Sequence, residues 1–237
     1  MKVQSGSAVM FHYLPGQHHH VAEWHNEIHR PEIQGAVPHV FYSQDFVAPP
    51  AYVAAREHAD LPMSGGEYLS VYWSEGSLEA YGEDSRKASQ ERRNAGSYHP
   101  FQDVVWASRL SATAAHPRPN LGYDVNAAPL TPNTGLVLVA ERLTIPERAD
   151  DYTRWLSTSH VPAVLAQGPF SACFEFVQED VRGTQVIQFW FVDRSDPLEA
   201  LEQFRQRSPN AEMAALRSRV FCGAYQPVIT GQYDIYT

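Results

Sequence analysis

Hydrophobic and polar positions along the chain predict two successive sets of four strands and two helices. In the first set, alternating or continuous apolar runs predict strands near 8–14, 38–44, 67–73 and 103–110, with helices near 18–33 and 76–94. In the second set, strands are expected near 134–143, 170–178, 184–193 and 220–228, with helices near 146–166 and 196–217. Each set therefore has the order strand, helix, strand, strand, helix, strand.

A short phrase recurs between the two sets. Trp24, His29 and Pro31 are repeated as Trp155, His160 and Pro162 with the same spacing, and an aromatic run follows each copy. Further along, residues 68–81 and 186–201 both read as an aromatic strand, a polar turn and a Leu-Glu-Ala helix start. Matching elements at a fixed offset are the sequence sign of a repeated structural unit.

The repeated order is that of the ferredoxin-like split βαβ unit, an antiparallel sheet with helices on one face. Strand 184–193 is apolar on both faces, so both faces of its sheet need cover. We therefore expect an α+β fold of two tandem ferredoxin-like βαββαβ units packed sheet to sheet as a barrel. The predicted boundaries are residues 1–113 for the first unit, with an insertion at 46–66, a Pro-rich linker at 114–133, and 134–237 for the second unit.

The chain resembles the dimeric α+β barrel (ferredoxin-like) superfamily, as a tandem two-repeat member. The resemblance rests on the Trp-x4-His-x-Pro motif and on the strand–turn–Leu-Glu-Ala element. The resemblance covers most of both units but not 46–66 or 114–133. It implies a ligand cleft within one unit, between the sheet and its helices. The superfamily contains cofactor-free isomerases, lyases, polyketide cyclases and monooxygenases, haem enzymes, and proteins without known activity, so the fold alone does not choose a function.

The composition of the chain argues against some classes of binding partner. The chain has 27 acidic and 18 Lys or Arg residues, a net charge of −9, which argues against binding nucleic acid or an anionic membrane surface. No apolar run approaches the roughly 20 residues that span a bilayer. The amino terminus lacks the features of a secretory signal, and the two cysteines suit a reducing compartment, so a cytoplasmic protein is expected. A disulfide between Cys173 and Cys222 stays open.

Histidine is concentrated at the start of the chain, where 7 of the 11 histidines fall within the first 40 residues. A histidine and a tyrosine around an apolar pocket can remove a proton beside a carbonyl and hold the resulting enolate. We therefore place the site in the first unit. The candidate catalytic residues are His29, His25, Tyr72 and His12. The candidate substrate-binding residues are Trp24, Phe11, Phe41, Tyr68, Tyr42 and His39.

Each of these residues has a structural interpretation as well. His29 and His160 recur, which favours a role in the fold, whereas His25 has no counterpart in the second unit, where Leu156 stands. His25 and His29 lie four residues apart and could join His18, His19 or His20 in a metal cage. A catalytic zinc site needs three ligands in fixed geometry, so neither a metal nor a cofactor is expected. The sequence carries no phosphate-binding glycine motif and no GxSxG elbow.

The function expected from the sequence is a cofactor-independent lyase, isomerase or cyclase acting on a small aromatic or polyketide-like carbonyl compound, as in aromatic compound catabolism. Two alternatives remain. One is a haem-binding enzyme or cofactor-free monooxygenase of the same fold, and the other is a non-catalytic small-molecule binding or assembly protein. The expected partner is a small molecule, and a homodimer is possible.

Overall fold

Eight antiparallel strands close into one barrel in the computed structural model, which describes residues 2–57, 63–97, 102–180, 183–207 and 211–233. The strands of the first half are β1 (Ser5–Tyr13), β2 (Val40–Val47), β3 (Tyr68–Ser74) and β4 (Gln102–Pro117). Those of the second half are β5 (Gly135–Leu143), β6 (Phe170–Asp180), β7 (Gly183–Val192) and β8 (Arg217–Pro227).

The strand order around the barrel is β1-β3-β2-β8-β5-β7-β6-β4. Within it, β2-β3-β1-β4 and β8-β5-β7-β6 each place the first strand of the half between its third and fourth, which is the ferredoxin-like order. Two seams join the halves: a short one between β2 and β8 at Phe46 and Val47, and a longer one between β4 and β6. The predicted α+β barrel is confirmed.

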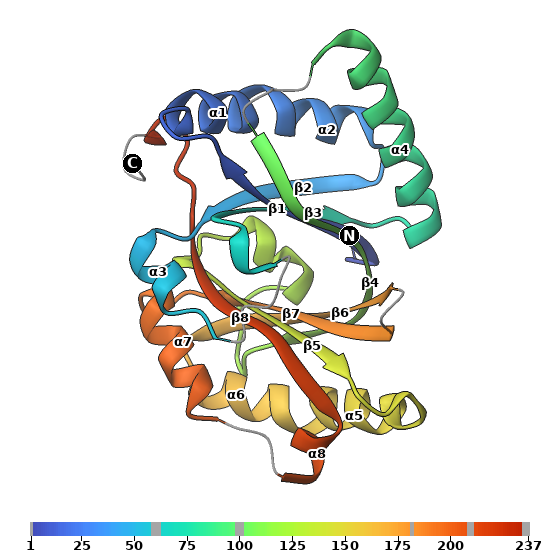
Figure 1. Cartoon of the computed structure of the whole chain (residues 1–237). Helices are drawn as coiled ribbons and strands as arrows, with labels where there is room; N and C mark the ends of the chain where they lie inside the picture. The colour runs from blue at the N-terminus through green and yellow to red at the C-terminus, as the bar shows by residue number, and fades with distance from the viewer. Residues whose placement is uncertain (1, 58–62, 98–101, 181–182, 208–210, 234–237) are drawn as a thin grey trace.

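Helices cover the outer faces of both halves of the barrel (Figure 1). Over the first half lie α1 (His18–Trp24), η1 (His25–His29), α2 (Arg30–Ala36) and α4 (Leu78–Ala95). Over the second lie α5 (Ala149–Trp155), η5 (Leu156–His160), α6 (Val161–Gln167), α7 (Pro197–Arg205) and α8 (Ala211–Ala215). The short elements are α3 (Pro50–Ala54), η2 (Met63–Gly65), η3 (Val125–Leu130) and η4 (Pro146–Arg148).

The repeated Trp-x4-His phrase forms a π-helical turn in each half. The N–H of Arg30 donates to the carbonyl of His25, and that of Val161 to the carbonyl of Leu156, so each bond spans five residues. This wider turn brings side chains five apart onto one face, which an α-helix does only for spacings of three or four. The rings of Trp24 and His29 accordingly stack at 4.8 Å, and those of Trp155 and His160 at 5.0 Å.

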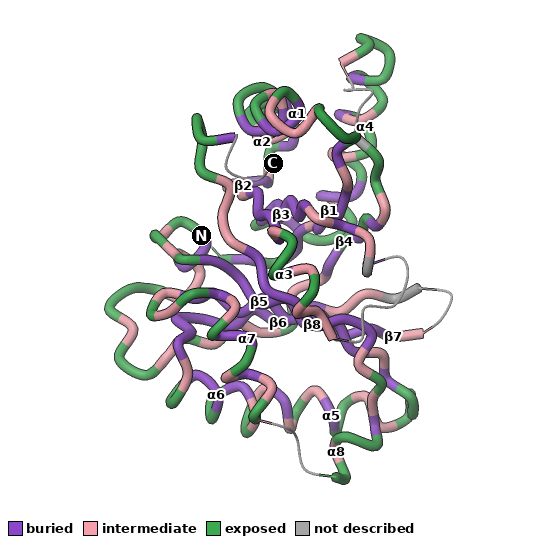
Figure 2. Tube along the Cα trace, turned by 60° about the vertical axis from the view of Figure 1, so that its left-hand side comes forward, coloured by how far each residue is buried: buried purple, intermediate pink, exposed green. Residues whose placement is uncertain are grey.

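The barrel interior is filled by aromatic rings from both halves. Trp73 of β3 contacts four phenylalanines of the second half, with centroid distances of 5.1 to 5.9 Å, namely Phe174, Phe176, Phe189 and Phe191. Trp190, on the other face of β7, packs instead against Phe170 and Phe204 under the helices. Figure 2 shows most strands, β7 among them, buried along most of their length, whereas β4 is largely intermediate or exposed. The expectation that strand 184–193 is covered on both faces is therefore correct.

Two boundaries differ clearly from the prediction, and one weakly predicted helix forms in full. The helix expected over 196–217 is two helices, because α7 ends at Arg205 and α8 begins at Ala211. Strand β4 runs on to Pro117, which takes the first four residues of the expected linker into the sheet. Helix α4 forms in full although its sequence has few apolar anchors: Ser77 caps its start, and Gly96 ends it in the left-handed region at φ 69°.

The insertion at 46–66 is fixed onto the second half of the barrel. Its α3 leads to Arg56, whose guanidinium lies 5.4 Å from the ring centre of Phe221 and 5.3 Å from that of Tyr225 in β8. Arg56 also donates to the carbonyl of Gly66 at 2.6 Å, and Glu57 pairs with Cys222 as a β-bridge. Residues 58–62 of the insertion lie outside the described residues.

Cys173 and Cys222 are both buried free thiols, so the disulfide left open by the sequence does not form. Burial raises the pKa of Cys222 to about 12, which keeps this thiol protonated at neutral pH. Within the described ranges, no helix is both long and apolar enough to cross a membrane.

Candidate functional site

A buried carboxylate–histidine pair lies between the helices and the sheet of the first half. The Nδ1 of His25, at the first position of the π turn, is 2.7 Å from Oδ2 of Asp45 in β2. Ser70, directly opposite Asp45 in β3, donates its hydroxyl to the other oxygen, Oδ1, at 2.5 Å. His25, Asp45 and Ser70 are each no more than 2% exposed. The bond at Nδ1 holds the ring orientation and leaves Nε2 as the nitrogen that can face a ligand.

Aromatic side chains of β1 and β3 form the wall next to this pair. The ring of Phe11 lies 5.2 Å from that of His25 and stacks on Tyr68 at 5.8 Å. Tyr13 stacks on Tyr68 at 4.0 Å and also lies 5.3 Å from Phe11, so the three rings form one cluster. The sequence places these residues on one face by strand alternation, since Phe11 and Tyr13 are two apart on β1.

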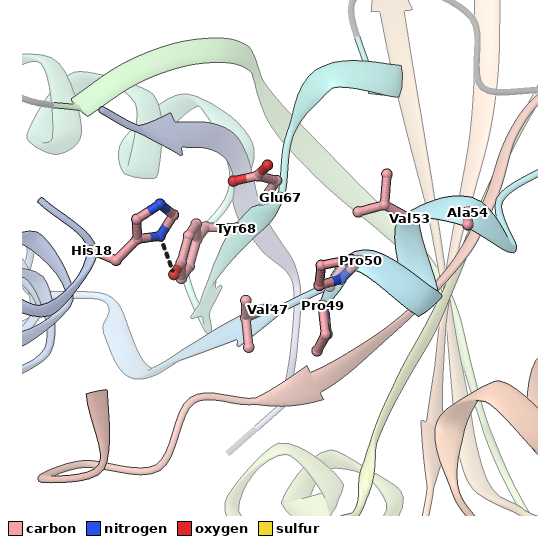
Figure 3. A pocket seen from close by; sticks show the side chains of 9 residues that line it. His18, Val47, Pro49, Pro50, Val53, Ala54, Glu67 and Tyr68 are labelled. Atoms are coloured by element: carbon pink, nitrogen blue, oxygen red, sulfur yellow. Dashed lines mark hydrogen bonds between the residues drawn. The ribbon is translucent and has the colours of Figure 1, made fainter. Parts of the chain in front are cut away.

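A partly open pocket of about 470 Å³ lies beside the buried Tyr68, which forms part of its lining (Figure 3). Its floor and one wall are apolar, contributed by the end of β2 and by α3, and its polar groups are His18, Glu67 and the Tyr68 hydroxyl. His18 Nδ1 is 3.0 Å from that hydroxyl. Tyr68 and Phe11 thus stand between the pocket and His25. The wall made by α3 shows that the insertion private to the first half contributes to this pocket.

The charges around the pair favour an ionised Asp45. Burial alone raises the pKa of the Asp45 carboxyl, but the adjacent His25, the Arg30 charge and the Ser70 hydrogen bond outweigh burial and leave the pKa below its usual value. Burial, and then the Asp45 charge, raise the pKa values of the Tyr13 and Tyr72 phenols well above the usual value. The site therefore combines a fixed carboxylate with phenols that stay protonated and can donate hydrogen bonds.

His29 has a different character from His25. Its ring lies 4.9 Å from that of His25 and is stacked on Trp24. Burial, followed by the His25 and Arg92 charges, lowers the pKa of His29 to about 3. His29 is therefore neutral at physiological pH and cannot act there as a proton-donating imidazolium. Its place at the end of the π turn, shared with His160, supports the structural interpretation of this residue.

The predicted site residues fall into two groups. The helix-facing side of the first-half sheet brings together most of them, namely His25, His29, Tyr72, Trp24, Phe11 and Tyr68. His12 points to the opposite face of β1, where its ring is 3.8 Å from Glu67. His39 lies at the other end of β2, against Gly76. Phe41 and Tyr42 pack against the barrel core, because a register shift between Val40 and Tyr42 changes the alternation there.

Sequence reasoning missed Asp45, the residue that orients His25. The available signal was a carboxylate inside the strand VFYSQDFV, where β2 is otherwise largely apolar or aromatic. A charged residue in such a strand is almost never buried without a partner. Alternation puts Ser70 on the same face of β3 as Tyr68 and Tyr72, but its role depends on a cross-strand pairing with Asp45 that local alternation does not specify.

The corresponding space in the second half is filled. Leu156 occupies the position of His25, and Trp190, Phe170 and Phe204 pack together beneath the helices. A carboxylate is retained on β6, where Glu175 accepts from Ser157 at 2.8 Å and lies 2.9 Å from His116 of β4. The second half thus has a buried acid, but its π turn begins with Leu156 where that of the first half begins with His25.

The metal cage considered from the sequence does not assemble in the described part of the chain. No three His, Cys, Asp or Glu side chains gather there with the geometry to hold an ion. His18 is bonded to Tyr68, whereas His19 lies 4.0 Å from Glu23 on the surface of α1.

No protein-family model and no curated protein matches the sequence. The structure is similar over 98% of its length to 98% of a protein provisionally assigned as a chlorite dismutase, with a TM-score of 0.60 and 10% identity. An anthrone oxidase-like protein gives a TM-score of 0.60 at 11% identity, over 98% of this chain and 95% of that chain. The encapsulated DyP-type peroxidase from Mycobacterium smegmatis gives 0.55 at 12% identity, over 100% and 97%.

These similarities establish the fold and contradict the leading functional prediction. These three proteins are named for a dismutase, an oxidase and a peroxidase, and not for a lyase, isomerase or cyclase. The prediction of a cofactor-independent lyase, isomerase or cyclase was wrong because histidines and tyrosines beside an apolar pocket do not by themselves specify the class of reaction.

Proposed function

We propose that this chain is an oxidoreductase that binds a small aromatic substrate in the first half of the barrel, and that it binds haem through His25. The observation that carries the proposal is the buried Asp45–His25 pair, with 2.7 Å between Oδ2 and Nδ1. Histidines that ligate metals nearly always donate the second ring nitrogen to a carboxylate or carbonyl, which fixes the tautomer and raises the basicity of the ligand. The similarity to chlorite dismutase-like and DyP-type proteins supports the same class of chemistry.

The first half provides both a nitrogen to bind the haem iron and aromatic side chains to pack against the haem. Nε2 of His25 would hold the haem iron, and Phe11 and Tyr68 would offer aromatic faces beside it. The second half does not suit a haem, since Leu156 replaces the donor and aromatic rings fill the space. When bound, the group would supply the electron-transfer or oxygen chemistry.

The chain's own groups have separate tasks in this proposal. Asp45 holds the proton of His25 on Nδ1, and Ser70 holds Asp45 in place through its second oxygen. The pocket of about 470 Å³ admits a small, largely apolar substrate beside α3. His18 and the Tyr68 hydroxyl, bonded to each other at the pocket wall, can hydrogen-bond a substrate oxygen.

Haemin titration of the purified protein tests the proposal. The wild-type protein should take up haemin with a shifted Soret band, and His25→Ala should weaken uptake by at least about tenfold because the nitrogen that would hold the iron is lost. His39→Ala, at the other end of β2, is the matched control and should bind as the wild type does. Asp45→Asn should keep uptake but change the absorption spectrum of the bound haem, because a neutral amide replaces the carboxylate that contacts Nδ1 of His25. A wild-type protein that takes up no haemin, or equal uptake by His25→Ala, would overturn it.

A cofactor-free oxygenase is the second candidate, favoured by the charge of the pocket lining. The described lining carries Glu67 and neither Lys nor Arg, so it offers no cation to the two propionates of a haem. In this reading, Nε2 of His25 removes the proton of a phenol, Asp45 stabilises the imidazolium, and the electron-rich phenolate reduces dioxygen. Oxygen consumption with an anthrone or another phenolic substrate, by protein free of haem and abolished in His25→Ala, would support this candidate over the first.

We also propose that the two halves are tandem copies of one unit, with 1–113 and 134–237 as the units and 114–133 as the linker. The shared strand order and the π turn at the same place in each half support this. A homodimer stays a prediction, which sedimentation of the purified chain can check.

A further inference from the structure

A second pocket lies on the first half, apart from the His25 site. It has a volume of about 390 Å³ and is formed between α4 and the outer faces of β1 and β4, whereas His25 lies over β2 and β3. Arginines from two elements line it, Arg86 and Arg93 from α4 and Arg109 from β4. Serines from all three elements add hydroxyl groups, namely Ser7, Ser85, Ser89 and Ser108.

The charge of this pocket is opposite to that of the protein. None of its lining residues is an Asp or Glu, although the chain has 27 acidic residues and a net charge of −9. Arg92, one position from Arg93, is buried and lies 3.2 Å from Glu32. By contrast, among the described residues no carboxylate lies within ion-pair distance of Arg86 or Arg109. The two guanidinium groups therefore face the pocket without a protein counter-ion.

The pocket is also shaped by a glycine inside a helix. A Cβ on Gly82, in α4, would lie 2.5 Å from Nη1 of Arg109, so glycine makes room for the guanidinium to lie across the helix. Glycine in a helix interior costs roughly 0.5–1 kcal/mol relative to alanine. Beside it, the Ser7 hydroxyl is held at 2.5 Å from the Tyr81 hydroxyl, which orders another polar group of the lining.

From this geometry we propose a binding site for a small molecule that carries an oxyanion group, phosphate or carboxylate. Guanidinium groups and hydroxyls are the donors that recognise such groups, and charge-assisted hydrogen bonds are about twice as strong as neutral ones. A neighbouring pocket of about 460 Å³ shares Arg109 and Ser108 and is partly lined by Leu78 and Val177. The oxyanion lies among the arginines, and an apolar body extends over Leu78 and Val177.

Calorimetric titration of the full chain at low ionic strength tests the site with inorganic phosphate, acetate and phenyl phosphate as probes. Saturable binding of phosphate or acetate identifies the oxyanion that the site takes, and phenyl phosphate should bind more tightly than phosphate because its ring reaches the apolar extension. Arg109→Gln should weaken binding by at least about tenfold, the loss expected for hydrogen bonds to a charged group.

Two further variants distinguish a specific binding site from general electrostatic attraction between the probe and the positive side chains of α4. Gly82→Ala keeps the net charge and favours the helix, yet its methyl displaces the Arg109 guanidinium, so binding should weaken severalfold. Lys87→Gln removes a positive charge from an exposed position of α4 outside the pocket lining and should bind phosphate as the wild type does. Absence of saturable binding by any probe, or equal losses in Lys87→Gln and Arg109→Gln, would overturn the proposal.

Discussion

Asp45 is the residue on which the first-half site depends. Its two oxygens hold His25 and Ser70, and these contacts, rather than the histidine alone, define which imidazole nitrogen is available. Strand and helix periodicity found His25, Phe11 and Tyr68, because each belongs to a regular local pattern. The same reasoning could not find Asp45, since its partner lies on a helix 20 residues away in the chain.

Replacing Asp45 tests how much the buried Asp45–His25 pair contributes to the stability of the fold. Asp45→Ala leaves His25 Nδ1 and the Ser70 hydroxyl without a partner, so the free energy of unfolding should fall by about 3–5 kcal/mol. Ser70→Ala removes one hydrogen bond to a charged group and should cost less, about 1.5–3 kcal/mol. Urea denaturation measures both, with the exposed Asp103→Ala as a control expected within about 0.5 kcal/mol of the wild type. A larger loss for Ser70→Ala than for Asp45→Ala would contradict this account.

At the scale of elements, the repeated Trp-x4-His motif and the insertion at 46–66 have different structural roles. The motif marks a π turn in both halves, which explains why Trp24 and His29 recur while His25 does not. The insertion occurs once, and α3 within it forms a wall of the pocket. Sequence spacing identified both features as unusual, but the docking of α3 on β8 depends on residues far apart in the chain.

Arg56 is the residue expected to hold the insertion against β8. Arg56→Met keeps an apolar stem but removes the contacts with the Phe221 and Tyr225 rings and the hydrogen bond to Gly66. We expect a local loss of about 1–2 kcal/mol, seen as roughly 5- to 30-fold faster amide exchange over residues 52–57. The control is Arg154→Met, whose side chain is 72% exposed. Unchanged exchange over 52–57 would show that other contacts hold α3.

At the scale of the whole molecule, the two halves share one aromatic core inside the closed barrel. Trp73 from the first half lies among four phenylalanines from the second, so neither half can bury its inner face alone. The two-sided apolar pattern of β7 predicted this packing correctly. The pairing of β2 with β8 and of β4 with β6, which closes the barrel, was not specified by the sequence pattern.

Trp73→Ala should destabilise both halves together. Loss of the buried indole is expected to lower the free energy of unfolding by about 3–5 kcal/mol, whereas Trp73→Phe retains an aromatic ring and should cost less. Far-ultraviolet circular dichroism and tryptophan fluorescence should report coincident unfolding transitions, because the shared core couples the halves. Two separated transitions in the wild-type protein would contradict a shared core.

The sequence by itself determined the order of elements, the two-sided burial of β7, the recurring helix phrase and the concentration of histidines in the first half. Each of these features follows from the order and spacing of residue types along the chain, which can be read without the fold. Only the tertiary structure decided that Asp45 meets His25, that α3 closes the pocket wall, and that Arg109 reaches across Gly82. Each of these contacts joins residues whose distance in space is set by strand pairing and helix packing, and local periodicity does not encode that distance.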